Sequence, residues 1–147
     1  MRQFVLFAWA ALLPCAALAQ APLATVDAYR GRPLTTGAWT LILAAGSSEA
    51  RFGEVGRPAR LTLRCDMVAR RVRISRPDRP PGPMTIVTTS VTRTLTAPAE
   101  VLAFEPLLDG IAFSRGRFVV TSGAGGSDVL IIPAWPEAAR IVEDCRK

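Results

Sequence analysis

The sequence predicts a mainly β domain, a small antiparallel β-sandwich or partly open barrel with a short helix and a C-terminal helix. Apolar and polar residues alternate along residues 59–66 and 70–75, and runs rich in Thr and Val are separated by Pro and Gly, as in strands. Near the end of the chain, apolar residues recur at spacings of three and four, as on one face of a helix. A helix packed on strands around one core fits these observations.

The first 19 residues have the layout of a secretory signal peptide. Arg2 precedes an apolar stretch at residues 4–13. Ala17 and Ala19 are small residues at the positions that the signal peptidase recognises. The apolar stretch is shorter than the roughly 20 residues that a membrane-spanning helix needs. We therefore expect a mature chain that begins at Gln20.

Cys15 offers an alternative, because a cysteine after an apolar stretch can be the lipidated first residue of a lipoprotein. Pro14 stands before it, where a lipobox requires a small residue, so we favour the signal peptide. The sequence predicts a periplasmic or secreted protein with no transmembrane segment after signal removal.

The mature chain is long enough for one domain, which we place at residues 37–147. Residues 20–36 have no sustained period and carry two prolines, which predicts a poorly ordered or surface-laid lead-in. A first strand is expected at residues 38–43. The polar segment "AAGSSEA", the short run "RFG" and a turn around residues 56–58 follow it.

The clearest pattern lies in "ARLTLRCD" and "RRVRIS", which predict an antiparallel hairpin. Leu61, Leu63 and Cys65 fall on one side of the first strand, while Val72 and Ile74 fall on one side of the second. Cys65 is therefore expected to point into the core.

The second half of the chain predicts further strands and two helices. The segment "MTIVTTSVTRTLTA" suits two strands or one bent strand. Pro106 and Pro136 stand where proline opens a helix, and the second helix is expected to end near Cys145. Between the helices, "GRFVVTS" and "DVLIIP" flank "GAGGS" and predict a second hairpin.

Cys145 is expected to form a disulfide with Cys65. Helical spacing places it on one face with Ala138, Ile141 and Val142, so both cysteines of the mature chain point inward. Disulfides persist in exported proteins. Two cysteines in such a protein are most simply explained as a disulfide. The other face of the helix is expected to hold the charged residues Glu137, Arg140, Glu143 and Asp144.

The chain has no histidine, which removes the commonest general base and the commonest nitrogen ligand for metals. With both cysteines oxidised, thiolate chemistry is also lost. We therefore predict a protein that is not an enzyme and has no cofactor, no metal site and no catalytic residue.

A carboxylate-dependent hydrolase of cell-wall glycans is an alternative, because glycoside cleavage requires only two carboxyl groups. Glu105 with Asp109 and Glu143 with Asp144 are the candidate pairs. Acidic residues near helix starts are also common for electrostatic reasons.

Positive charge is concentrated in one part of the chain. Residues 51–79 hold nine arginines and three acidic residues, a local net charge of +6. Without Arg2 the chain has 17 basic and 12 acidic residues, so the rest of the mature chain sums to −1.

The predicted hairpin carries Arg60, Arg64, Arg71 and Arg73 on the faces opposite its apolar residues. Four guanidinium groups on one exposed face suit the oxygen atoms of phosphates or carboxylates. An ordinary solvated face is the alternative, since the chain uses 17 arginines and a single lysine. These four arginines are the predicted binding residues.

The predicted partner is an anionic envelope polymer or an acidic protein surface. A nucleic acid partner is not expected, because the compartment argues against it and aromatic residues do not interleave with the basic segment. A further alternative is an inhibitor or accessory of another envelope enzyme.

The segments "LLDGIAFSRGRFVV" and "LIIPAWPEAARIVEDCR", together with "LTLRC", resemble an uncharacterised family of small secreted alphaproteobacterial proteins. Residues 116–120, 129–132 and 136–145 are also similar to the C-terminal strand, strand and helix of two periplasmic groups. These are the invasion-associated locus B type proteins and the small type VI secretion accessory proteins. The resemblance implies a β-sandwich without catalysis.

Overall fold

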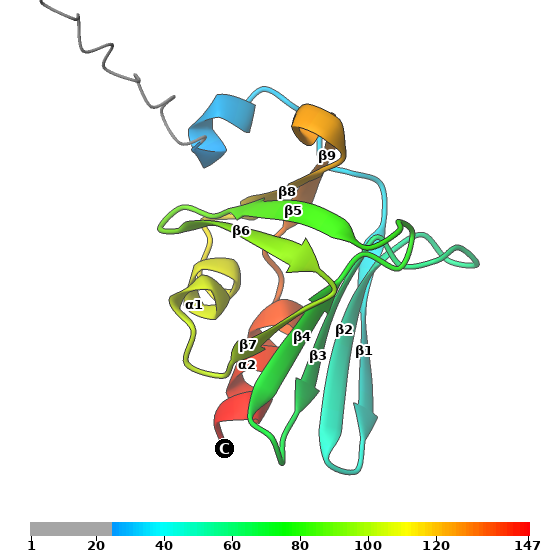
Figure 1. Cartoon of the computed structure of the whole chain (residues 1–147), viewed down its shortest axis with the longest axis vertical. Helices are drawn as coiled ribbons and strands as arrows, with labels where there is room; N and C mark the ends of the chain where they lie inside the picture. Colours follow the sequence, from blue (N-terminus) through cyan, green and yellow to red (C-terminus); the bar gives the residue numbers. More distant parts are fainter. Residues whose placement is uncertain (1–24) are drawn as a thin grey trace, which may run out of the picture.

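The computed structural model describes residues 25–147, which form two antiparallel sheets and two α-helices (Figure 1). Sheet A has the order β1-β2-β3-β4-β7, and sheet B the order β6-β5-β8-β9. Sheet A contains β1 (Ala38–Ala44), β2 (Ser47–Gly53), β3 (Leu61–Asp66), β4 (Arg71–Ser75) and β7 (Ala99–Leu102). Sheet B contains β5 (Gly82–Val87), β6 (Thr92–Ala97), β8 (Arg117–Ser122) and β9 (Asp128–Pro133). The predicted β-sandwich is confirmed.

Both predicted helices are present, and each has proline in its first turn, where the missing N–H costs no hydrogen bond. Helix α2 (Pro136–Arg146) packs on β1 to β4, and α1 (Pro106–Ala112) packs on α2. In Figure 1 both helices lie below sheet B, while the 3-10 helix η1 (Val26–Tyr29) lies above it. A second 3-10 helix, η2 (Ala124–Gly126), stands in the β8–β9 loop.

The hairpin of β3 and β4 pairs as predicted. Leu63 lies opposite Ile74 and Cys65 lies opposite Val72, and all four side chains are buried. Burial of their apolar surface stabilises this hairpin against the helix that covers it.

Strand β2 is longer than predicted. Residues 47–50 belong to "AAGSSEA", which reads locally as a turn, yet they pair with β1 on one side and β3 on the other. Only Ala45 and Gly46 remain as the turn, and Gly46 has the positive φ of 75° that such a turn favours. Pairing with a strand on each side thus holds these residues in a strand although Ser and Glu have a weak preference for that conformation.

Trp39 links the two sheets. Its Nε1 donates a hydrogen bond to the carbonyl oxygen of Pro133 at 2.9 Å, which joins β1 to the end of β9. Its ring lies 5.5 Å from the ring of Phe52 and 6.5 Å from that of Phe118, centroid to centroid. The core of the domain therefore continues from one sheet into the other.

The described part of the lead-in lies on the second face of sheet B. Val26 forms a small apolar cluster with Val87, Val119 and Ile131. The backbone N–H of Thr35 donates to the carbonyl oxygen of Ile131 at 2.9 Å. Sheet B is therefore covered on both faces here, which explains why the run "FVV" is apolar without alternation.

The predicted signal peptide and the first residues of the lead-in lie outside the described residues. Within residues 25–147, no helix combines the length and the apolar character needed to cross a membrane.

The predicted disulfide is confirmed. Cys65 in β3 and Cys145 in α2 are bonded, with their Cα atoms 5.5 Å apart. The prediction for Asp144 is wrong, because only 5% of its surface is exposed. A helix that packs on four strands buries more than the narrow apolar stripe that the spacing of its residues suggests.

Replacing both cysteines, Cys65→Ala with Cys145→Ala, is expected to lower the free energy of unfolding by about 4 to 5 kcal/mol in the chain-entropy model. The physical reason is the sequence separation of 80 residues that the bond closes. Urea unfolding of the oxidised proteins measures this difference. A reducing agent should weaken the parent and leave the double variant unchanged, and equal stability of the two oxidised proteins would contradict the expectation.

Candidate binding groove

The outer face of sheet A, the face turned away from α2, carries rows of polar side chains. Strand register fixes which residues share a row, because paired residues on neighbouring strands point to the same side. The central outer row runs across all five strands and consists of Ile42, Glu49, Arg64, Arg73 and Glu100.

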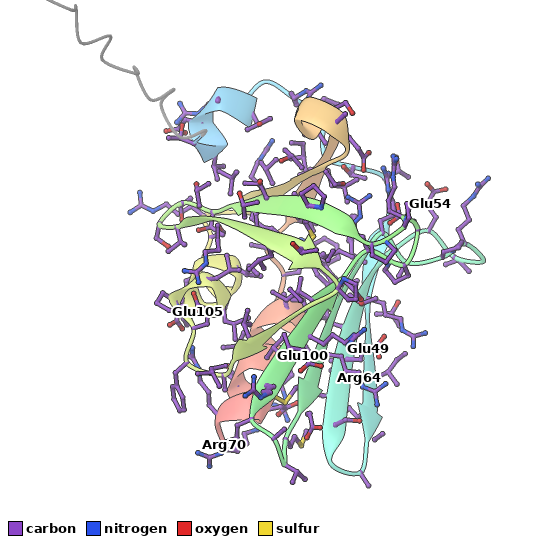
Figure 2. The ribbon with its side chains drawn as sticks, in the orientation of Figure 1. Glu49, Glu54, Arg64, Arg70, Glu100 and Glu105 are labelled. Carbon is purple, nitrogen blue, oxygen red and sulfur yellow. A yellow bond between two sulfur atoms is a disulfide. The ribbon has the colours of Figure 1, made fainter. Side chains whose placement is uncertain are left out.

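Arg64 and Arg73 lie directly opposite each other on β3 and β4. Like charges in this arrangement destabilise a sheet unless other groups compensate. Glu49 and Glu100 flank the pair: Arg64 Nη1 is 3.8 Å from Glu49 Oε2, and Arg73 Nη1 is 3.4 Å from Glu100 Oε1. Figure 2 shows Glu49, Arg64 and Glu100 near one another on this sheet.

These two ion pairs are long and exposed. The side chains of Arg64 and Arg73 are 59% and 51% exposed, so solvent weakens their attraction to the flanking carboxylates. Most N–H donors of both guanidinium groups therefore remain accessible to a ligand.

The other two predicted binding residues occupy different positions. Arg71 is exposed in the neighbouring outer row, opposite Asp66. Arg60 precedes β3 and is only 31% exposed, and its Nε lies 4.0 Å from Asp78 Oδ2. The structure therefore brings Arg64 and Arg73 together and directs Arg60 toward a separate ion-pair cluster.

A groove of about 710 Å³ runs over this face, between sheet A and the loop that joins β2 to β3. Its walls include Arg51, Arg57, Arg64 and Arg73, and the acidic residues Glu49 and Glu54. Four positive and two negative side chains give this lining a net charge of +2. Glu49, Arg51 and Arg57 were not among the predicted site residues, because their place beside Arg64 depends on the pairing of β2 with β3.

A cluster of Arg76, Asp78, Arg79, Ser122 and Asp128, centred on the buried Arg76, lies beyond one end of β4. The Arg76 side chain is 2% exposed and donates from Nε and Nη2 to the two carboxylate oxygens of Asp78, each at 3.0 Å. It also donates to Asp128 Oδ2 and Ser122 Oγ, each at 2.8 Å. Because Ser122 and Asp128 belong to β8 and β9, these bonds join the end of sheet A to sheet B.

The pKa values in this cluster follow from the balance of burial and pairing. Burial alone would lower the pKa of Arg76, but hydrogen bonds and charge attraction from Asp78 and Asp128 raise it above its ordinary value. Burial would raise the pKa of Asp128, but Arg76, Arg79 and Ser122 hold it below its ordinary value. Both groups therefore stay charged at neutral pH, and the cluster is a structural contact.

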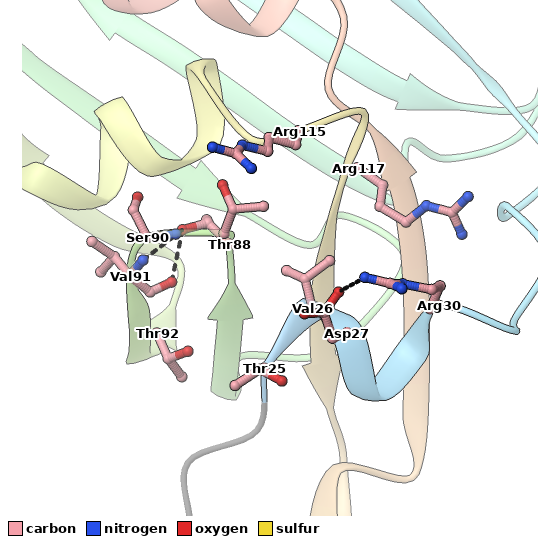
Figure 3. A pocket seen from close by; sticks show the side chains of 11 residues that line it. Thr25, Val26, Asp27, Arg30, Thr88, Ser90, Val91, Thr92, Arg115 and Arg117 are labelled. Carbon is pink, nitrogen blue, oxygen red and sulfur yellow. Dashed lines mark hydrogen bonds and ion pairs between the residues drawn. The ribbon is translucent and has the colours of Figure 1, made fainter.

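A second cavity, of about 870 Å³, lies between η1, the β5–β6 turn and the α1–β8 loop. Arg115 and Arg117 line one side of it, and Thr88 and Ser90 come from the turn (Figure 3). Asp27 and Arg30 form an ion pair of 2.7 Å at its rim. Most of the residues that line this cavity are polar, and it lies over sheet B, away from the predicted arginine residues.

The candidate carboxylate pairs each have basic partners. Glu105 Oε1 is 3.2 Å from Arg93 Nη1, and Asp109 Oδ1 is 2.7 Å from Arg146 Nη1. Asp144 Oδ1 is 3.0 Å from Arg140 Nε and 2.9 Å from Lys147 Nζ.

Burial would raise the pKa of Asp144, but Lys147 and Arg140 hold it below its ordinary value. A general acid for glycoside cleavage requires the opposite shift. The Asp144 carboxyl group therefore does not suit the role of general acid, and the hydrolase alternative stays a prediction.

No protein-family model, no curated protein and no solved structure matches this chain. The resemblances drawn from the sequence therefore stay predictions, and the function is argued from the site itself.

Acid is expected to destabilise the fold through Asp128. Its pKa in the folded protein lies below the ordinary value of 3.8, so its stabilising contribution is complete at neutral pH and is lost as the pH falls through the folded value. The Asp128→Asn variant is expected to be less stable at pH 7 and to lose less stability between pH 7 and pH 2. Urea unfolding across this range measures both effects.

Asp27→Asn is the matched control, because Asp27 is 76% exposed and its pairing with Arg30 is screened by solvent. This variant should lose stability in acid as steeply as the parent protein. An equally steep loss of stability in Asp128→Asn would show that the cluster around Arg76 does not cause the acid sensitivity.

Proposed function

We propose that this is an exported, non-enzymatic binding protein that holds an anionic partner in the groove on the outer face of sheet A. The observation that carries the proposal is the direct opposition of Arg64 and Arg73 within that groove. The predicted signal peptide and the disulfide support export.

The guanidinium groups of Arg64 and Arg73 have unused hydrogen-bonding capacity. Hydrogen bonds between a guanidinium and a carboxylate or phosphate are shortest and strongest at about 2.7 to 2.9 Å. The distances of 3.8 Å to Glu49 and 3.4 Å to Glu100 are well outside that range. A ligand oxygen that approaches closely would therefore add bonds and relieve the repulsion between the two arginines.

The shape of the groove favours an extended partner. One sheet face and one loop form its walls, so the groove is open along its other sides. A segment of an acidic protein or an anionic polymer can lie across several strands in such a groove. Guanidinium groups bind carboxylates and phosphates in the same planar geometry, so the groove suits either kind of anion.

Charge reversal tests this proposal. Arg64→Glu and Arg73→Glu are each expected to weaken binding to immobilised polyglutamate at low salt by roughly tenfold or more, since each removes charge-assisted hydrogen bonds. Binding of the parent protein should also weaken steadily as salt is added.

Arg32→Glu provides the control, because it changes the net charge equally and its side chain is exposed outside the groove. It should bind polyglutamate almost as the parent does. If Arg32→Glu and Arg64→Glu lose affinity equally, only net charge matters and the groove is not the binding site.

A further inference from the structure

Strand β1 forms a free edge of sheet A beside the groove. Among the described residues it hydrogen-bonds as a strand only with β2. It is seven residues long and contains only Ala, Trp, Thr, Leu and Ile, without a charged residue or a proline. Its outer backbone groups therefore form a template on which another strand can pair.

The other three edge strands carry features that oppose pairing with another chain. Strand β7 contains Glu100, and β6 contains Arg93. Strand β9 contains Asp128 and ends in Pro133, and it also bonds to Thr35 of the lead-in. Charge, proline and covering segments are the usual protections of a sheet edge. Strand β1 is the one described edge that lacks them.

Exposed apolar side chains accompany this edge on both faces. Ile42 is 39% exposed and belongs to the outer row that lines the groove. Leu43 is 62% exposed and points to the opposite side of the sheet. A strand paired with β1 would cover both side chains at once.

We infer that the partner in the groove is an acidic protein, and that one of its extended segments pairs with β1 as a sixth strand of sheet A. This inference rests on the proposed function, because it names the kind of anionic partner. The segment has acidic residues at alternate positions on the groove side, and apolar residues between them that pack beside Leu41 and Leu43.

The reach of the arginine side chains fits this arrangement. Neighbouring strands lie about 4.8 Å apart, so the added strand would be roughly 10 Å from β2. Arg51 lies on β2 opposite Thr40, and both line the groove. Arg51 Nε donates to Glu49 Oε1 at 2.5 Å, but the Arg51 side chain is 51% exposed, so its other N–H donors can meet a glutamate of the added strand above Thr40. Arg57 on the neighbouring loop adds positive charge.

Charge complementarity favours this partner over a second copy of the same chain. Pairing of β1 with β1 of another copy would cover Leu43, but β1 has no acidic residue to bring to the groove. It would also bring together two mature chains that each carry a net charge of +5, from 17 basic and 12 acidic residues. An acidic strand would cover this edge and also place carboxylates beside Arg51 and Arg57.

The test uses a blocked heptapeptide of alternating glutamate and valine, together with two N-methylated forms. One form is methylated on the glutamate nitrogens and the other on the valine nitrogens. In a strand these two sets of N–H groups point to opposite edges, so only one set can bond to β1. Exactly one methylated peptide is therefore expected to lose at least tenfold in affinity, while the other binds as the parent peptide does.

Amide signals from residues 38–44 should shift and gain protection from hydrogen exchange when the parent peptide binds. Absence of peptide binding, or equal affinity of both methylated forms, would overturn the inference. A stable dimer that buries β1 in the free protein would overturn it as well.

The outcomes also separate this inference from the proposed function. If all three peptides bind equally and Arg64→Glu abolishes their binding, the groove binds anions without strand pairing. If Arg64→Glu leaves the binding of polyglutamate unchanged, the proposed function itself fails, whichever peptide binds to β1.

Discussion

The bond between Cys65 and Cys145 holds α2 on the inner face of sheet A, and the organisation of both faces follows from it. Cys65 lies in β3, the middle strand of the five, so the helix is fixed over the centre of the sheet. The residues beneath it, Leu63, Val72 and Ile74, have no measurable exposure. With the inner face closed by the helix and the core, the outer face of sheet A is the one left to carry charge.

The arginines of residues 51–79 have different roles although they form one basic segment in the sequence. Arg76 is enclosed with Asp78 and Asp128 and joins the two sheets. Arg70 donates to the carbonyl oxygen of Lys147, beside the end of α2. Arg64 and Arg73 face solvent in the groove. The positive charge of this segment is therefore divided between contacts that stabilise the fold and an exposed surface for which we propose anion binding.

The free edge of sheet A is anchored to the core at one end of β1. Trp39 at the start of β1 is fixed by its hydrogen bond to Pro133 and its packing on Phe52, so one end of the edge strand is held by the core. A binding edge that is already in place loses little conformational entropy when a partner binds. The buried Trp39 at one end of β1 therefore helps to hold the exposed remainder of the strand in the position that the proposed pairing requires.

The sequence by itself determined the β3–β4 hairpin, the helices that begin at Pro106 and Pro136, and the disulfide. The hairpin follows from a local period of two, and the helices follow from a proline that opens each of them. The disulfide follows because the mature chain has only two cysteines. It also placed Arg64 and Arg73 on one face. Only the tertiary structure decided that residues 47–50 are a strand, that β7 returns to β4, and that Glu49 and Glu100 flank the arginines. The tertiary structure also decided that Asp144 is buried. All these features depend on contacts between segments that are distant in the chain, and no local pattern encodes which segments meet.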